Sequence, residues 1–310
     1  MKNINLNSLD LDMLNAVADL HEVPQGAYNI RRNGEGYGRR STENIIIETK
    51  EDNPGINIIV RENTKNESVH SPVIITETGV NDLVYNDFYI GDNSDVLIVA
   101  GCGIHNSGSQ KSEHDGIHRF HIGKNARVKY VEKHYGEGDG SGERVLNPTT
   151  EVYMEENSYC EMEMVQIKGV DSTERKTTAE LKDGARLLLL ERLMTHGKQY
   201  ARSDMEVNLN GADSSAQIIS RSVAKDFSRQ IFYPRAVGNN RCRAHVQCDS
   251  IIMDSANIRS IPEIAANHPE ANIVHEEAIG RINNDQLLKL CTIGLSEAEA
   301  EEIIINCFLK

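Results

Sequence analysis

The strongest constraint on the fold is a short unit that the chain repeats through its middle. The copies are IGDNSDVLIV (90–99), IGKNARVKYV (122–131), MEENSYCEME (154–163) and LKDGARLLLL (181–190). Each copy starts with an apolar residue, crosses two or three turn formers, places a small residue and then alternates as a strand. Those small residues, at intervals of 32, 32 and 27, are Ser94, Ala126, Ser158 and Ala185. Repeats of this length are typical of solenoids and propellers.

Small residues suit the tight inward corners of stacked β-coils, and the chain has no Trp for a propeller signature. Upstream, β-branched runs separated by turn residues extend the pattern: ENIIIETK, GINIIVRE and SPVIITETG. The sequence therefore predicts a mainly β fold, with a β-solenoid over residues 40–282. A β-sandwich stays open, because periodicity identifies strands but not their pairing.

Residues 1–39 are expected to hold a short helix and a linker. Leu11, Leu14 and Val17 recur at helical spacing, and Pro24 and the following glycines end the helix. A solenoid exposes strand edges at both ends, and exposed edges invite association. We expect this helix to cap the first coil, and residues 245–281 to form a symmetric dimer contact.

Residues 283–310 predict a closing pair of helices. Asp285 is the expected N-cap of the first helix and Gly294 its stop, while Ser296 and Glu299 form a capping box for the second. The apolar residues of the second helix fall on one face: Ala300, Ile303, Ile304, Cys307 and Phe308. Two interpretations stay open: a helix folded back on the solenoid, or a grip for another protein.

Composition excludes several function classes. A net charge of −14 and a pI near 5.3 argue against nucleic acid or an anionic membrane as partner. No apolar run approaches about 18 residues and the N-terminus lacks a signal-like segment, so a soluble, cytoplasmic protein is expected. The six cysteines include no CxxC pair and are expected to be free thiols.

The triplet His275-Glu276-Glu277 is the sharpest candidate for chemistry. In a strand, His275 and Glu277 share one face and Glu276 takes the other. Imidazole and carboxylate can bind iron or zinc, although charged residues at a strand end are more often simply solvated. Cys242 and Cys248 are expected on one strand face, where a structural role is favoured.

Other motifs favour no site. His105 and His114 are expected in a polar loop and His118 and His121 on opposite strand faces, so the histidines of 105–134 are interpreted as surface residues. The runs GEGYG (34–38) and YGEGDGSGER (135–144) lack a phosphate-loop pattern and predict flexible projecting loops. No nucleotide site is found, so any ATP would be hydrolysed by another chain.

The chain resembles the SufB/SufD family, the scaffold subunits of the SUF machinery for iron–sulfur cluster assembly, over roughly residues 26–310. The most specific segments are YNIRRNGEGYGRRSTENI (28–45), DGIHRFHIGKNARVKYVEKHYG (115–136), QCDSIIMDSANIRSIPEI (247–264) and HEEAIGRINNDQLLKLCTIGLSEAEAEEIIINCFL (275–309). Only about 25 residues precede this region, as in a short, minimal member.

The resemblance implies a right-handed parallel β-helix, a homodimer or a heterodimer with a related subunit, and binding of an ABC-type ATPase, SufC. It also implies a non-catalytic scaffold that holds an iron–sulfur cluster transiently. His275 matches the interface histidine of SufD-type subunits and Glu276 the interface glutamate of SufB-type subunits. Counting back from His275, Ala266 stands where SufB-type subunits place their essential cysteine.

Either the chain works as a SufD-like partner, or an unusual site uses His275 and Glu276 with Cys248 or another thiol. The expected cluster ligands are His275, Glu276, Glu277 and Cys248. The expected ATPase-binding residues are Leu287, Leu288, Leu290, Leu295, Ile303, Ile304 and Phe308. Two rival functions are a carbohydrate-active β-helix, which the scarcity of aromatics and the absence of an export signal disfavour, and a structural interaction module without metal.

Overall fold

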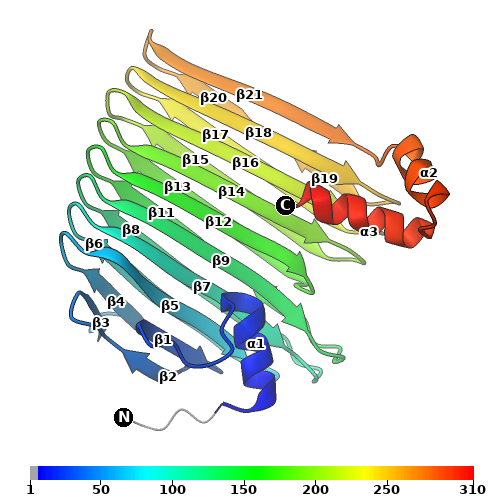
Figure 1. Ribbon diagram of the computed structural model, residues 1–310, viewed down its shortest axis with the longest axis horizontal. Helices are drawn as coiled ribbons and strands as arrows, with labels where there is room; N and C mark the ends of the chain where they lie inside the picture. The colour runs from blue at the N-terminus through cyan, green and yellow to red at the C-terminus, as the bar shows by residue number, and fades with distance from the viewer. Residues whose placement is uncertain (1–5) are drawn as a thin grey trace.

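The chain folds into a β-solenoid of about eight turns, in a computed structural model that describes residues 6–310 (Figure 1). Two sheets face each other across one core. The first has ten strands, in the order β2 (Glu35–Arg40), β1 (Ala27–Arg32), β5 (Lys65–Ile75), β7 (Asp95–His105), β9 (Arg127–Glu137), β12 (Tyr159–Lys168), β14 (Arg186–Thr195), β16 (Ser214–Ala224), β18 (Cys242–Ile252) and β21 (Ala271–Gly280).

The second sheet has eleven strands. They are β19 (Asn257–Ser260), β17 (Arg229–Gly238), β15 (Tyr200–Leu209), β13 (Ser172–Leu181), β10 (Arg144–Leu146), β8 (Ser112–Ile122), β6 (Asn81–Ile90), β4 (Gly55–Val60) and β3 (Ile45–Thr49), with β11 (Thr149–Met154) beside β13 and β8 and β20 (Glu263–Ala266) beside β17. From β5 onward the described pairs are parallel and join each strand to the equivalent strand of the next coil. This pairing confirms the solenoid and excludes the sandwich.

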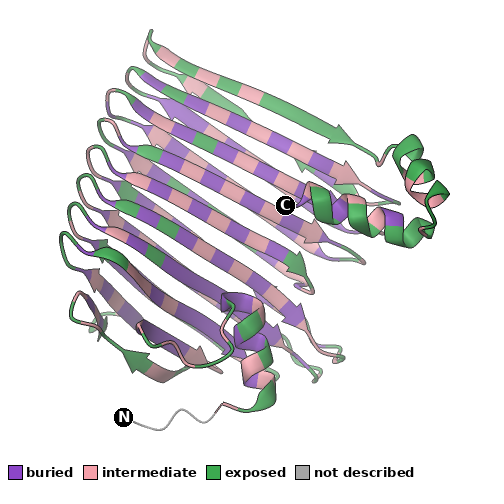
Figure 2. Ribbon diagram, in the orientation of Figure 1, coloured by how far each residue is buried: buried purple, intermediate pink, exposed green. Residues whose placement is uncertain are grey.

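Inward and outward side chains alternate along each strand, which gives the striped burial pattern of Figure 2. The inward side chains of both sheets meet in a core whose largest fully buried rings are Phe88, Phe120 and Tyr130. Phe88 and Phe120 stack with ring centroids 4.3 Å apart, one coil above the other. The core therefore packs between coils as well as within each coil.

The small residues of the repeat occupy the predicted inward corners. Ser94, Ala126, Ser158 and Ala185 are fully buried, each at the turn that leads into a strand of the ten-stranded sheet. The residue before each corner has positive φ and is Asn or Gly, the residues that adopt this conformation most readily. The side-chain amide of Asn125 donates to Asn93 on the coil below, 3.2 Å away. The repeat thus encodes a turn that stacks on its own copy.

Helix α1 (Ser8–Ala18) forms as predicted, but it does not cap the first coil. It begins at a capping box between Asn7 and Asp10 and lies on the outer face of the ten-stranded sheet, over β5, β7 and β9. Glycine makes this possible, because a Cβ at Gly103 would come within 2.4 Å of the Met13 side chain. The expectation of an end cap was wrong because two glycines of β7 leave a seat for the helix on the sheet face.

Antiparallel hairpins begin the solenoid instead. β1 pairs with β2 and β3 pairs with β4, and the first of these hairpins contains the GEGYG run, which is a strand rather than the predicted loop. The second glycine run is also not a free projection. A Cβ at Gly140 would come within 2.3 Å of the Gly108 carbonyl oxygen on the neighbouring coil, so the glycines allow two loops to stack.

The C-terminal helices are α2 (Asn284–Thr292) and α3 (Glu297–Phe308). The N-cap of α2 is Asn283, which accepts a hydrogen bond from the Asp285 backbone, so Asp285 lies in the first turn and was wrongly assigned as the cap. The capping box of Ser296 and Glu299 is confirmed. No helix in the described part of the chain is long and apolar enough to cross a membrane.

Helix α3 folds back on the solenoid. Ile305 and Leu309 are buried against Val223 and Met253, and Phe308 packs partly on the same cluster. Ile303 and Cys307, predicted on this face, are exposed instead, because the helix is rotated so that Ile305 faces the sheet. Helix α2 has no buried residue.

Three of the five histidines between residues 105 and 134 lie inside the solenoid, so the prediction of surface histidines was wrong for them. His114 and His118 lie on β8, and His134 lies on β9. His114 was expected in a loop, but its strand begins at residue 112, and its Nδ1 lies 3.0 Å from a buried Asp82 carboxylate oxygen. Polar residues therefore occupy inward positions that the alternation reserves for the core.

His118 and His121 do take opposite faces, as predicted. His118 lies inward, with its ring nearly parallel to that of Phe88 at 6.0 Å. His121 lies outward, stacked between Tyr89 and Tyr153 at 4.9 and 5.2 Å. The Nδ1 atom of His118 is buried and has no hydrogen-bond partner in the protein.

The pH dependence of stability should reflect the burial of His118. Burial lowers the pKa of His118 to about 4, whereas an unfolded histidine titrates near pH 6.5. Between these two pH values the histidine is protonated in the unfolded chain and neutral in the folded chain. The free energy of unfolding therefore takes no penalty from His118 above about pH 6.5. It falls by about 3 kcal/mol in all on account of His118 as the pH drops toward 4.

We expect His118→Phe to flatten the loss of unfolding free energy between pH values of about 7 and 4.5, measured by urea denaturation. His121→Phe, on the outer face of the same strand, should keep the wild-type slope. Equal slopes for His118→Phe and the wild type would contradict this assignment.

Candidate functional site

The candidate site lies at the last coil, where the ten-stranded sheet ends. β21 pairs with β18 on one side, and no strand of the described residues 6–310 lies on its other side (Figure 1). Its side chains are half-buried at best, in contrast to the buried stripes of the preceding strands (Figure 2). Side chains of β21 that point toward the core are thus accessible from the open end.

Cys248, His275 and Glu277 meet on the inward face of this coil. The parallel register places Cys248 of β18 directly opposite Glu277 of β21, with His275 two residues earlier on the same face. His275 Nε2 lies 3.8 Å from Cys248 Sγ and 3.8 Å from a Glu277 carboxylate oxygen. The predicted sharing of one face by His275 and Glu277 is confirmed, and the fold adds the thiol.

Glu276 takes the opposite face, as predicted, and lies on the outside of the solenoid. Its carboxylate oxygen is 3.4 Å from Nε2 of His245 on β18, and its side chain is 66% exposed. The corresponding values for His275 and Glu277 are 19% and 27%. The four acidic and imidazole groups therefore form an inner pair beside the thiol and an outer pair in solvent.

The thiol of the site is Cys248, not a residue at position 266. Ala266 lies on β20, in the other sheet, opposite Gly238. Cys242 shares the inward face of β18 with Cys248, as predicted, but lies six residues away near the opposite corner. All six cysteines are free thiols, as predicted.

The pKa of Cys248 is raised to about 12, mainly by burial, with the charges of Glu277 and Glu191 acting in the same direction and a contact with Ser260 opposing them. The isolated thiol is therefore protonated at neutral pH. A bound metal ion would displace that proton, because a coordinating thiol is deprotonated by the cation charge. The site therefore favours a cation over an electrophile as the partner of this thiol.

A buried polar chain leads to Cys248 from inside the solenoid. Ser220 lies opposite Cys248 on the next coil and donates to Glu191 across 3.0 Å. Arg175 lies between the carboxylates of Glu191 and Glu132, and its guanidinium donates to Glu132. Burial alone would raise the pKa of Glu132, but the charge of Arg175 holds it well below its usual range.

The sequence analysis did not predict this buried polar network, although the alternation of the strands indicated it. Glu191 falls on the same alternation phase as the buried Leu187 and Leu189 in LLLLER, and Glu132 on the same phase as Val128 and Tyr130. A charged residue at an inward phase must be paired inside the core. The signal becomes readable once the corner residues fix which phase is inward.

Within residues 6–310, no three His, Cys, Asp or Glu side chains are arranged to hold a metal ion. Cys248 Sγ and a Glu277 oxygen each approach His275 Nε2 but do not surround one centre with it. Thiolate, imidazole and carboxylate are nevertheless donors suited to iron. The donor types fit iron, and their number in one chain falls short of a closed site.

The residues expected to bind an ATPase differ in accessibility. Leu288 and Ile303 are exposed, at 64% and 41%, and Ile293, which the sequence did not single out, is 76% exposed. Phe308 is half-buried and packs partly against the solenoid. The remaining four are half-buried: Leu287, Leu290, Leu295 and Ile304.

Known proteins with similar sequences work in iron–sulfur cluster assembly. A SufBD family protein of Methanocaldococcus jannaschii is 29% identical over 85% of this chain and 84% of its own length. One of Pyrococcus horikoshii is 29% identical over 74% of this chain and 69% of its own length. The assembly protein SufB of Bacillus subtilis is 26% identical over 41% of this chain and 28% of its own length.

The family model described as SUF system FeS cluster assembly, SufBD core domain, matches residues 82–308. The matched region begins in β6 and includes β18, β21 and both C-terminal helices. It covers well over half of the sequence, and on that basis the chain belongs to the SufBD family of iron–sulfur cluster assembly proteins.

Proposed function

We propose that this protein is a non-catalytic scaffold subunit on which an iron–sulfur cluster is assembled as cargo. The observation that carries the proposal is the meeting of Cys248, His275 and Glu277 at the open end of a SufBD solenoid. Thiolate is the usual cluster ligand and imidazole a known substitute for it. In the cytoplasm, where reducing conditions preserve thiols, Cys248 would be available to bind iron.

A second subunit would complete the site. The unpaired edge of β21 can pair with another strand. A closed two-fold contact along this edge would bring two inward donor sets to one seam. We propose a dimer through β21, formed with a second copy or with a related SufB/SufD subunit, in which Glu276 lies near the seam as well.

A SufC-type ABC ATPase would bind the helix pair and supply the nucleotide chemistry. Helix α2 buries no side chain, and its exposed Leu288 adds to Ile293 of the hinge and Ile303 of α3. Apolar helical side chains presented together suit helix-in-groove recognition. Because α3 also packs on Val223 of β16, movement of the helices could be transmitted to the coils beside the site.

A structural module without metal is the rival that this site must be tested against. A carbohydrate-active β-helix has less support, because no described feature beyond the solenoid itself favours it. The reconstitution experiment below separates a cluster scaffold from a module that binds no iron.

Replacing Cys248 by Ser should abolish most cluster formation. After anaerobic reconstitution with iron and sulfide, the wild type should show visible sulfide-to-iron absorption. Cys248→Ser should retain at least about tenfold less iron and sulfide, since even indirect partners of metal ligands act on that scale. Cys242→Ser changes a buried thiol on the same face of the same strand and should behave as the wild type. Equal loading of both variants would refute a role for Cys248.

A charge at the open end should weaken the proposed dimer. Ile279 points inward on β21 yet is 41% exposed, because no further coil covers it. Ile279→Lys should raise the dissociation constant about tenfold or more, since a lysine would be desolvated at the seam. Analytical ultracentrifugation measures the dissociation constant, both for the chain alone and for its mixture with a related subunit. Leu83→Lys, at an outward position of similar exposure on β6, is the control; unchanged association of Ile279→Lys would argue against the β21 seam.

Charges on the helix pair should weaken ATPase binding. Leu288→Asp combined with Ile303→Asp should reduce affinity for the SufC-type ATPase by about a hundredfold, because both apolar contacts are lost and carboxylates are buried. Co-purification and isothermal titration calorimetry measure this. Leu97→Asp, at an exposed position in the middle of the solenoid, should bind normally. Retained binding by the double variant would exclude the helix pair as the grip.

A further inference from the structure

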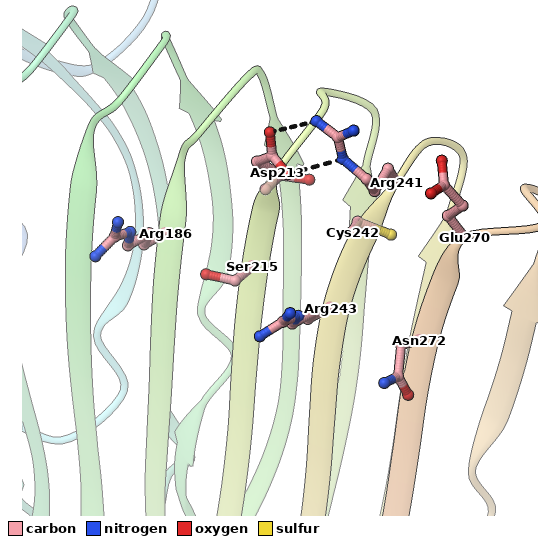
Figure 3. A pocket seen from close by; sticks show the side chains of 9 residues that line it. Arg186, Asp213, Ser215, Arg241, Cys242, Arg243, Glu270 and Asn272 are labelled. Atoms are coloured by element: carbon pink, nitrogen blue, oxygen red, sulfur yellow. Dashed lines mark hydrogen bonds and ion pairs between the residues drawn. The ribbon is translucent and has the colours of Figure 1, made fainter.

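A groove of about 600 Å³ crosses the outer face of the ten-stranded sheet near its corner turns (Figure 3). It belongs to neither the cluster site nor the helix pair. Its lining residues come from four neighbouring strands and the turns before them: Arg186, Asp213, Ser214, Ser215, Arg241, Cys242, Arg243, Glu270 and Asn272. This volume is within the range of small-molecule sites.

The register of the coils creates the groove. Arg186 of β14, Ser215 of β16 and Arg243 of β18 lie opposite one another in a single row. Because adjacent strands are about 4.8 Å apart, the two arginine Cα atoms flank the serine at about 10 Å from each other. The short Ser215 side chain leaves the space between them open, and Asn272 of β21 continues the row.

The two arginines of this row form no salt bridge within residues 6–310, although the charge of Arg243 acts at longer range on Asp213 and, after the hydrogen bonds from Arg241, helps to lower the pKa of that carboxyl. Among the described residues, neither the Arg186 nor the Arg243 guanidinium donates a hydrogen bond, and the backbone N–H of Arg186 donates to Ser158. The nearby Asp213 carboxylate is already held by Arg241 through two hydrogen bonds of 2.9 and 2.7 Å (Figure 3). Each free guanidinium keeps its forked set of N–H donors for an outside acceptor.

The groove continues into a second hollow of about 440 Å³ that shares Ser215, Arg243 and Asn272 with it. This part is lined by Tyr159, Leu188 and other apolar side chains. The Tyr159 ring is held in place by Arg127, whose guanidinium lies 4.8 Å above the ring centroid. A cationic end thus leads directly into an apolar end.

We propose that this groove binds a small organic phosphate, with its phosphate group between Arg186 and Arg243 and its apolar body along Tyr159 and Leu188. Planar guanidinium groups match phosphate oxygens with paired hydrogen bonds, and Ser215 adds a hydroxyl donor at the centre of the row. The chain carries a net charge of −14, so most of its surface repels anions, and a local pair of free arginines selects where an anion can settle.

Isothermal titration calorimetry of the full chain with 1-naphthyl phosphate and with inorganic phosphate tests the proposal. We expect the naphthyl ester to bind more tightly than inorganic phosphate, because only the ester has an apolar body. The double variant Arg186→Gln with Arg243→Gln should weaken binding of the ester at least about tenfold. Leu188→Asn should weaken binding of the ester several-fold and leave the affinity for inorganic phosphate unchanged.

Arg221→Gln removes another outward arginine of β16 that does not line the groove, and it should bind both probes as the wild type does. If the double arginine variant fails to fold, Ser215→Glu places a carboxylate between the two arginines and should abolish binding. Absence of binding of either probe to the wild type, or equal losses in the arginine pair and Arg221→Gln, would overturn the proposal. Equal affinity for a glutamate-rich peptide would also overturn it, by showing a general acidic contact. These measurements involve neither iron nor ATPase, so they are independent of the scaffold proposal.

Discussion

The structure depends on parallel, in-register stacking of one coil on the next. Each strand completes its backbone hydrogen bonds with the equivalent strand of the coils above and below, and each inward side chain packs against its counterpart. Because every interior coil is satisfied by its two neighbours, only the ends of the solenoid remain incomplete. At the N-terminal end, antiparallel hairpins begin the two sheets. At the C-terminal end the outer edge of β21 pairs with no strand of the described residues, and that is where the donor groups gather.

The same stacking explains how a polar chain survives in the core. Charged residues inside a low-dielectric interior are tolerated when they are paired and hydrogen-bonded. Arg175 lies between Glu132 and Glu191, and hydroxyl groups of Ser203 and Ser220 donate to Glu191. One guanidinium, that of Arg175, thus faces two carboxylates, those of Glu132 and Glu191. The negative charge of Glu191 adds to burial in raising the pKa of Cys248 and keeps the thiol protonated. A cation arriving at the open end would meet a site that is short of positive charge.

The sequence predicted the architecture because the turn of each repeat requires particular residue types. Small residues such as Ser94 and Ala126 fit the corners, and Asn93 and Asn125 tolerate positive φ before them. The position of α1 could not be predicted in this way. Its seat on the sheet depends on the missing Cβ atoms of Gly101 and Gly103, and a glycine in a strand does not say what approaches it.

The candidate site was predicted in part. The faces of His275, Glu276 and Glu277 followed from strand alternation alone. The meeting with Cys248 did not, because it requires the length of the last coil, which is 29 residues from Cys248 to its register partner Glu277, whereas the repeat gave intervals of 32, 32 and 27. With that length known, Cys248 falls opposite Glu277 and within reach of His275, two residues earlier on the same face.

Period and phase together, rather than motif spacing along the chain, determine which residues meet in this fold. The arginine row shows the same rule on the outer face, since Arg186 and Arg243 are 57 residues apart in sequence and two strands apart in space. Residues that form a site in a solenoid are separated by multiples of its coil length. Searches for ligand spacings of two to five residues therefore overlook them, whereas a search at the coil period would find Cys248 opposite Glu277, next to His275, and would find the arginine pair.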